Sequence, residues 1–296
     1  MTQLTHLTMP FAPHTCYYPR PIHFAKISRV IMYGLPTTTP MFQFHGEEQS
    51  SRVLDQELNR YELTGKDPYV IITSVEERSF LEYFTKSCND ILRKPCVSYY
   101  DQHSIVLVEM ESEVHATGCG SFKTIIDTWV HKSKSLVCPT GSAMFRGVTR
   151  WKKAECSWKP AELPSGRNPK WPSMAVDVRY SEPVSHLMND VCFWLDESNG
   201  DVNIVLTVSI SGRHKISIEK WSLHHRRSQE KPIPFPTAKI EIAKGPERAS
   251  RPKITGNITI LFEDMFLRPK MPTENDLTLS RPDLERMALQ IWAVQD

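Results

Sequence analysis

The sequence predicts a mixed α/β fold, and three observations carry this prediction. Apolar, β-branched segments suited to buried strands occur at 104–110, 173–180 and 202–210. Segments with apolar residues at helical intervals follow the first two of them, at 113–132 and 182–199. The order strand, helix, strand over 173–210 is a βαβ unit, and both of its strands are apolar enough to be central. We therefore expect a mixed sheet covered by helices on both faces.

The chain before 96 is expected to hold an arm and a helical lead-in. Residues 1–50 are rich in proline, threonine and aromatic residues, and the repeated prolines interrupt every candidate helix. We interpret this segment as a proline-rich arm that wraps the domain or joins two copies into a homodimer. Helical spacing at 51–63 and 76–92 predicts a helical lead-in over 51–95.

The rest of the chain, 96–296, is expected to form the core of a single domain that spans 51–296. A hairpin is predicted at 143–151, a strand at 152–160 and an exposed proline-rich loop at 160–172. Further strands are predicted at 215–223, 237–243 and 257–266. Ser280 is a suitable N-cap and Pro282 suits a first turn, so a last helix is predicted over 281–294.

Composition limits which binding partners and which cellular compartment the sequence predicts. The 36 Lys and Arg residues nearly balance the 34 Asp and Glu residues, so a nucleic-acid contact would need a local basic patch. The seven cysteines are scattered without a C-x-x-C pair, which argues against a disulfide framework or a zinc knuckle. The N-terminal segment does not read as a secretion signal, and no apolar run is long enough to span a membrane. We expect an intracellular protein, cytoplasmic or nuclear, that is neither secreted nor bound to a membrane.

Asp177 is the strongest chemical feature of the sequence. It lies in the middle of the apolar segment 174–178, and a buried carboxylate is costly unless it binds a cation or hydrogen-bond donors. Arg179 lies two residues further along, so it shares a face of the strand with Asp177. The pair is either part of a catalytic site or an internal salt bridge.

Four other residues are candidates for the same site. Glu155 precedes this unit, and strand alignment would place its carboxylate beside that of Asp177, as a Mg²⁺ ion requires. The alternative is that Glu155 is a solvated surface residue. His115 is either a general base beside Glu111 and Glu113 or a structural histidine. Two tryptophans either bind substrate by stacking or fill the core, namely Trp158 and Trp171.

The succession of these segments resembles the restriction-endonuclease-like family of the PD-(D/E)XK superfamily, and most closely its divergent fungal members. The resemblance covers about 95–295. It is carried by a histidine-bearing helix with His115, a strand of the A-(D/E)-x-S-(W/F)-x-P type at 154–160, a P-x-x-x-V-(E/D)-V strand at 172–178, Tyr180-Ser181-Glu182, Phe193-Trp194-Leu195, Ile204-Val205-Leu206 and the C-terminal strand that ends at 262–269.

The resemblance implies a restriction-endonuclease-like central mixed sheet and a metal-dependent nuclease. In the family, the acids at the positions of Glu155 and Asp177 hold Mg²⁺ and a lysine orients or activates the attacking water. This chain departs from that pattern, because Arg179 stands at the lysine position and Asp190 at the alternative position on the next helix. A guanidinium does not accept a proton, and a carboxylate does not replace an ammonium group. Lys215 or Lys220, on a later strand, would have to substitute in space.

Three functions remain open on the sequence alone. The first is a Mg²⁺-dependent nuclease, a hydrolase of phosphodiesters with a degenerate active site, in which Arg179 stabilises charge and the substrate is nucleic acid. The second is the same scaffold used without a metal on a small organic substrate, as a cyclase or isomerase of fungal secondary metabolism. The third is a non-catalytic interaction module that dimerises through the arm.

Overall fold

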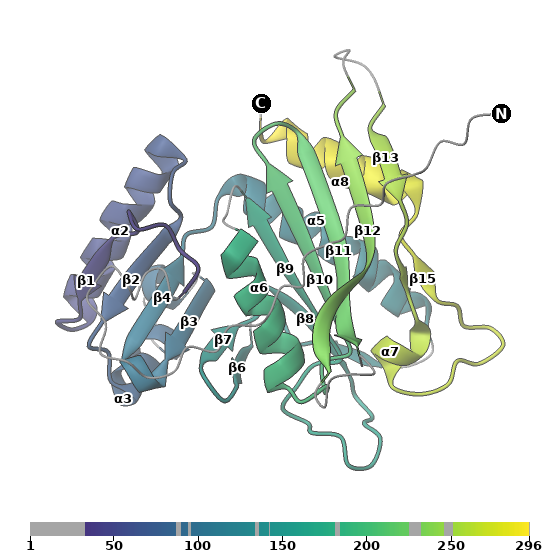
Figure 1. Ribbon diagram of the computed structural model, residues 1–296, viewed down its shortest axis with the longest axis horizontal. Helices are drawn as coiled ribbons and strands as arrows, with labels where there is room; N and C mark the ends of the chain where they lie inside the picture. Colours follow the sequence, from purple (N-terminus) through teal and green to yellow (C-terminus); the bar gives the residue numbers. More distant parts are fainter. Residues whose placement is uncertain are drawn as a thin grey trace, which may run out of the picture.

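The computed structural model describes residues 33–86, 90–93, 96–133, 136–141, 143–180, 184–224, 232–245 and 251–295. Two sheets lie side by side in Figure 1, the smaller formed by the N-terminal part of the chain and the larger by the C-terminal part. Both are mixed or antiparallel sheets flanked by helices, so the predicted mixed α/β class is confirmed.

The larger sheet contains the predicted βαβ unit. In spatial order its seven strands are β13 (Lys253–Gly256), β12 (Ile233–Ala243), β11 (Lys215–His224), β10 (Ile204–Ser211), β9 (Met174–Tyr180), β8 (Cys156–Pro160) and β5 (Val137–Pro139). Strands β9 and β10 are parallel, with Asp177 opposite Thr207, whereas every other neighbouring pair is antiparallel. The parallel pair is joined by α6 (Val184–Cys192) and the π-helical turn η3 (Phe193–Glu197), as the sequence predicts.

Helices cover both faces of the larger sheet (Figure 1). On one face lie α5 (Glu113–Lys132) and α8 (Arg281–Ala293), which share an apolar core with Val176 and Val178 of β9. On the other face lie α6 and η3, which pack against Ala175. Alternation along β9 therefore directs Asp177 and Arg179 toward α6, because both occupy the same face as Ala175.

The smaller sheet follows the order β1-β2-β4-β3-β7-β6. Its strands are β1 (Met41–Gln43), β2 (Tyr69–Thr73), β4 (Ile105–Glu109), β3 (Cys96–Tyr100), β7 (Trp151–Lys153) and β6 (Met144–Arg146). Helical segments accompany it as α2 (Glu47–Thr64), α3 (Glu77–Ser79), η1 (Phe80–Thr85), α4 (Asp90–Arg93) and η2 (Asp101–His103). The segment 51–95 thus includes a central strand, β2, as well as the helices that the sequence predicts.

The segment 257–266 differs from the predicted strand. Only β14 (Thr259–Ile260) is extended, and it pairs with β15 (Leu277–Thr278). The following residues form the short helix α7 (Phe262–Phe266). Phe262, Met265 and Phe266 recur at helical spacing, so a helix buries all three in the core, whereas a strand would place Met265 and Phe266 on opposite faces.

Three other predictions concern the N-terminal arm, the cysteines and membrane-spanning segments. Most of the proposed arm, residues 1–32, lies outside the described residues. Cys192 is disulfide-bonded, whereas Cys119, Cys138 and Cys156 are free thiols, so the scattered cysteines do include a disulfide. Within the described ranges, the helices lack the length and apolar character that a bilayer-crossing segment needs.

Candidate functional site

The candidate site lies where β8 and β9 separate. The two strands pair antiparallel from Trp158↔Met174 to Cys156↔Val176, and Glu155 and Asp177 lie just beyond the last pair. Glu155 precedes β8 and is not part of its ladder, so its side chain can turn back toward the edge of β9. Its Oε2 accepts a hydrogen bond of 2.6 Å from the Val178 backbone N–H. The Glu155 carboxylate is thus fixed against the backbone of β9, one residue beyond Asp177.

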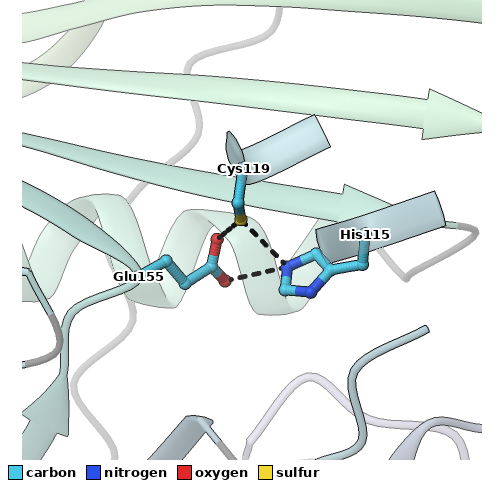
Figure 2. A group of neighbouring side chains, drawn as sticks. All are labelled: His115, Cys119 and Glu155. Atoms are coloured by element: carbon cyan, nitrogen blue, oxygen red, sulfur yellow. Dashed lines mark hydrogen bonds and ion pairs between the residues drawn. The ribbon is translucent and has the colours of Figure 1, made fainter. Parts of the chain in front are cut away.

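The Glu155 carboxylate contacts one face of α5. Its Oε1 lies 3.3 Å from His115 Nε2, and its Oε2 lies 3.4 Å from Cys119 Sγ. Figure 2 shows His115 and Cys119 reaching from the same helix toward the carboxylate from two sides. His115 Nε2 also lies 3.0 Å from the Val178 carbonyl oxygen. His115 thus contacts Glu155 directly.

The Asp177 carboxylate points the other way, toward α6 and η3. Its Oδ2 accepts a hydrogen bond of 2.9 Å from Trp194 Nε1, and its Oδ1 lies 3.7 Å from Lys152 Nζ. Oδ1 is buried and makes no hydrogen bond within the described part of the chain. The two acids are neighbours, but their carboxylates contact different helices.

Lys152 of β7 provides the ammonium group that Arg179 and Asp190 do not. Its side chain is 2% exposed, and Nζ donates a hydrogen bond of 2.9 Å to Asp190 Oδ2. Asp190, on α6, also accepts a bond of 2.7 Å from Arg150 and lies 3.7 Å from Arg179. The carboxylate at the alternative lysine position therefore holds a lysine from the smaller sheet.

Sequence reasoning missed Lys152 for a physical reason. Lys152 and Lys153 are adjacent in a short strand, and nothing local distinguishes the buried side chain from the half-buried one. The difference depends on where the smaller sheet meets α6. The proposed substitutes lie elsewhere, since Lys220 donates to the Thr259 carbonyl oxygen and Lys215 is exposed.

The pKa values of the three buried acids, Asp177, Asp190 and Glu155, shift in different directions. Burial raises the pKa of Asp177 to about 6, and repulsion by Asp190 and Glu155 adds to the shift while Lys152 opposes it. Burial also acts to raise the pKa of Asp190, but attraction by Lys152, His186, Arg150 and Arg179 outweighs it and holds that pKa well below the ordinary value. For Glu155, burial is likewise outweighed, by His115 and then Lys152, so its pKa is lowered. Lys152 thus acts on all three acids.

The two predicted substrate-binding tryptophans are core residues in this structure. Trp158 faces α5, is 1% exposed, and donates a hydrogen bond of 2.8 Å to Asp127 Oδ1. Trp171 is 5% exposed and stacks on Phe145 with ring centroids 5.9 Å apart. Neither ring offers a free face for stacking on a base.

Arg179 lines a cavity of about 440 Å³ on the α6 side of the larger sheet. The other lining residues come from α6 and from β10, β11 and β12: Leu187, Ser209, Ile210, Ser211, Lys215, Ile216, Ser217, Glu241, Ile242 and Ala243. The cavity combines two cationic side chains, Arg179 and Lys215, with the carboxylate of Glu241 and several serine hydroxyl groups. Its lining includes neither His115 nor Trp158.

Comparison with known proteins gives a weak likeness to a solved structure. No family model matches the chain. No curated protein matches it either. Among solved structures, the chain is similar to a candidate nuclease belonging to DUF820 from Anabaena variabilis ATCC 29413, with 13% sequence identity and a TM-score of 0.38, covering 70% of this chain and 98% of that chain. So weak a likeness assigns neither family nor activity, and the function proposed below is built on the residues of the site.

Proposed function

We propose that the chain is a divalent-metal-dependent phosphodiesterase of the nuclease type, with its site at the point where β8 and β9 separate. The observation that carries the proposal is the placement of Glu155 next to Asp177 with the buried ammonium group of Lys152 acting on both. Two acids and one lysine are the charge set that this chemistry requires, because the acids hold the ion and the cation stabilises the phosphorane charge.

The residues present fit a divalent cation. Asp177 Oδ1 is a buried carboxylate oxygen that makes no hydrogen bond within the described ranges, and Lys152 Nζ, at 3.7 Å, is too distant to donate one, so a bound divalent cation would compensate its charge more closely. Asp177 would hold the ion, and Glu155 would have to turn its carboxylate from α5 toward α6 to join it. When bound, Mg²⁺ supplies Lewis-acid polarisation of the phosphoryl oxygens.

The remaining residues have distinct roles in this proposal. Lys152 is fixed by Asp190 and presents its charge to Asp177. Arg179 reaches from the same face of β9 into the neighbouring cavity, where its guanidinium would bind a phosphate. His115 orients Glu155 through the 3.3 Å contact and is a positioning residue rather than a general base.

Hydrolysis of labelled single- and double-stranded DNA and of a simple aryl phosphodiester tests the proposal. We expect cleavage with Mg²⁺ or Mn²⁺, loss with excess chelator, and a fall of at least about 100-fold in Asp177→Asn, as for loss of a group that stabilises transition-state charge. The matched control is Asp55→Asn on the exposed face of α2, which should cleave like the wild type. Cleavage that persists unchanged in a folded Asp177→Asn protein would reject the proposal.

The cavity beside Arg179 favours a second candidate function. Its two cationic side chains and its serine hydroxyl groups suit a small organic acid, which would be used without a metal by a cyclase or isomerase. This alternative predicts that small organic acids raise the melting temperature of the wild type and not that of Lys215→Gln. Metal-dependent DNA cleavage together with no such shift would reject it.

A further inference from the structure

We propose that His115, Cys119 and Glu155 form a binding site for a zinc ion. The three side chains each offer one ligand atom, and these atoms all lie within 4.8 Å of one another. The site shares Glu155 with the proposed hydrolytic site, but it rests on ligand chemistry alone and stands whether or not the chain cleaves phosphodiesters.

The helix places two of the ligands. His115 and Cys119 are four residues apart on α5, so they lie one turn apart on the same face. The first turn is fixed by Ser112, whose side chain accepts a hydrogen bond of 3.1 Å from the His115 backbone N–H. Gly118 lets this part of α5 approach the sheet, because a Cβ there would lie 2.8 Å from Ile210 Cδ1 and 3.0 Å from Val178 Cγ1.

The ligand atoms lie close to the spacing that a tetrahedral ion imposes, and the distance of 3.8 Å from His115 Nε2 to Cys119 Sγ is slightly long. His115 Nε2 lies 3.3 Å from Glu155 Oε1 and 3.8 Å from Cys119 Sγ, and Cys119 Sγ lies 3.4 Å from Glu155 Oε2. Bonds of about 2.0–2.3 Å to nitrogen, oxygen and sulfur around a tetrahedral zinc separate its ligand atoms by about 3.3–3.6 Å. The two contacts of Glu155 use different oxygens, so a slight rotation of the carboxylate or bidentate binding would complete the set.

The donor types select zinc over magnesium. Imidazole nitrogen and thiolate sulfur are zinc ligands, whereas magnesium prefers oxygen ligands and keeps several waters. One thiolate and one carboxylate together carry two negative charges, so a divalent ion would leave the buried set neutral. Side-chain exposures of 4% for His115 and 5% for Glu155 make this neutrality important, since an unbalanced charge is costly there.

The surroundings hold the ligands in place. The Val178 N–H fixes the Glu155 carboxylate through the 2.6 Å hydrogen bond, which is the outer support that metal ligands in proteins usually have. An ion on His115 Nε2 would displace the contact of this nitrogen with the Val178 carbonyl oxygen. The loss is one hydrogen bond, which is small against the free energy of binding zinc to three protein ligands.

The arrangement also leaves a position open. Three protein ligands and a fourth position for water are the pattern of catalytic zinc sites, whereas structural sites use four protein ligands. Cys119 is half-buried, and the exposed Glu111 lies close enough to interact electrostatically with His115 and Glu155.

Metal content and cobalt substitution of the full-length protein test the inference. We expect about one equivalent of zinc per chain after dialysis against metal-free buffer, from a set of three ligands. We also expect a near-ultraviolet thiolate-to-cobalt absorption band in the Co²⁺-loaded protein. Cys119→Ser should abolish this band and Cys138→Ser, which removes an exposed free thiol on β5, should keep it.

Each outcome decides the inference. A band that persists in Cys119→Ser, or a wild type that retains no zinc, overturns it. If Cys119→Ser does not fold, His115→Gln and the zinc-dependent rise in melting temperature of the wild type decide instead, and no rise overturns the inference. Zinc binding without DNA cleavage would leave this site intact and reject the phosphodiesterase, whereas Mg²⁺-dependent cleavage without zinc binding would do the reverse.

Discussion

At the scale of single residues, neighbours rather than residue type determine the behaviour of the two buried aspartates. Asp177 and Asp190 are both almost completely buried, which alone would raise the pKa of each. Four basic side chains surround Asp190 and lower its pKa, whereas Asp177 contacts Lys152 at 3.7 Å and a tryptophan N–H among the described residues. Asp190 therefore acts as the fixed anion of the cluster, and Asp177 is the acid that titrates.

Asp177→Asn should change how stability depends on pH. Between pH 3.8 and about 6 the folded protein holds a proton on Asp177 that the unfolded chain has released, so this residue lowers stability as the pH rises. Because the variant has no carboxyl group at this position, its free energy of unfolding does not fall in this way. Relative to the wild type, its free energy of unfolding should therefore rise by up to about 3 kcal/mol across that pH interval. Urea unfolding at several pH values measures the gain. Equal pH dependence in both proteins would contradict the assigned pKa.

Lys152→Met should be strongly destabilising. Removing the ammonium group leaves Asp177 and Asp190 buried with less positive charge around them, which costs about 3–5 kcal/mol. The matched control is Lys153→Met, one residue along the strand and half-buried, which should cost less than about 1 kcal/mol. Denaturant unfolding compares the two, and similar losses would show that Lys152 has no special role.

At the scale of elements, the close approach of α5 to β9 positions the site. The helix carries His115 and Cys119 and also packs Phe122 and Ile126 into the core shared with β9. Ser112 begins it and Gly118 permits its contact with the sheet. The packing of α5 therefore sets both the stability of the larger sheet and the geometry around Glu155.

Two glycines of α5 should respond oppositely to substitution. Gly118→Val would force the helix from β9 and β10 and should cost about 1–3 kcal/mol, as overpacking does. Gly120→Ala meets nothing within 4 Å and should stabilise by about 0.5–1 kcal/mol through helix propensity. Thermal unfolding of both variants tests the pair, and a neutral Gly118→Val would show that the helix can move freely.

The elements that the sequence predicts well are those with long periodic patterns. The predicted helix at 113–132 matches α5, and the predicted βαβ unit matches β9, α6 and β10. An apolar stripe that continues over at least three helical turns, or a strand that is apolar throughout, fits few other secondary structures. The secondary structure of short segments is harder to predict. The residues of α7 form a five-residue helix rather than a strand. Their aromatic side chains fit the spacing of a helix and of a strand equally well, so packing in the core decides between the two.

At the scale of the whole molecule, buried charges join the two sheets. Arg150 and Lys152 lie at β7 of the smaller sheet, and both bind Asp190 on α6 of the larger one. Arg150 also donates a hydrogen bond of 2.7 Å to Tyr100 Oη on β3. The cluster therefore connects β3, β7 and α6, which are distant in sequence.

Asp190→Asn should weaken both sheets together. The change leaves three cations buried with one anion fewer, and breaking a buried ion pair costs about 3–5 kcal/mol. Hydrogen exchange should become faster in β3 and in β9, because the lost contacts lie between the sheets. The exposed pair on α2 offers a control, since Glu48→Gln should leave exchange in both strands unchanged. Faster exchange in one sheet only would contradict a joining role.

The site itself was only partly predictable. The shared face of Asp177 and Arg179 follows from alternation along β9, whereas the turn of the Glu155 side chain toward α5 does not, because Glu155 precedes the ladder of β8. Lys152 and Cys119 are not predictable either, because their proximity depends on how a second sheet and a helix pack against β9, and neither has a local signature. The placement of Trp158 and Trp171 also needed the structure, since a large aromatic residue near a site serves equally well as a core residue.

Both proposals depend on Glu155 as a ligand of a divalent cation. Crystals of the full-length protein grown with Mn²⁺ or with Zn²⁺ allow a direct measurement, because either ion gives an anomalous X-ray signal. We expect an anomalous peak within bonding distance of the Glu155 carboxylate, about 2.0–2.3 Å from an oxygen. Density at Glu155 without such a peak in either condition would contradict it.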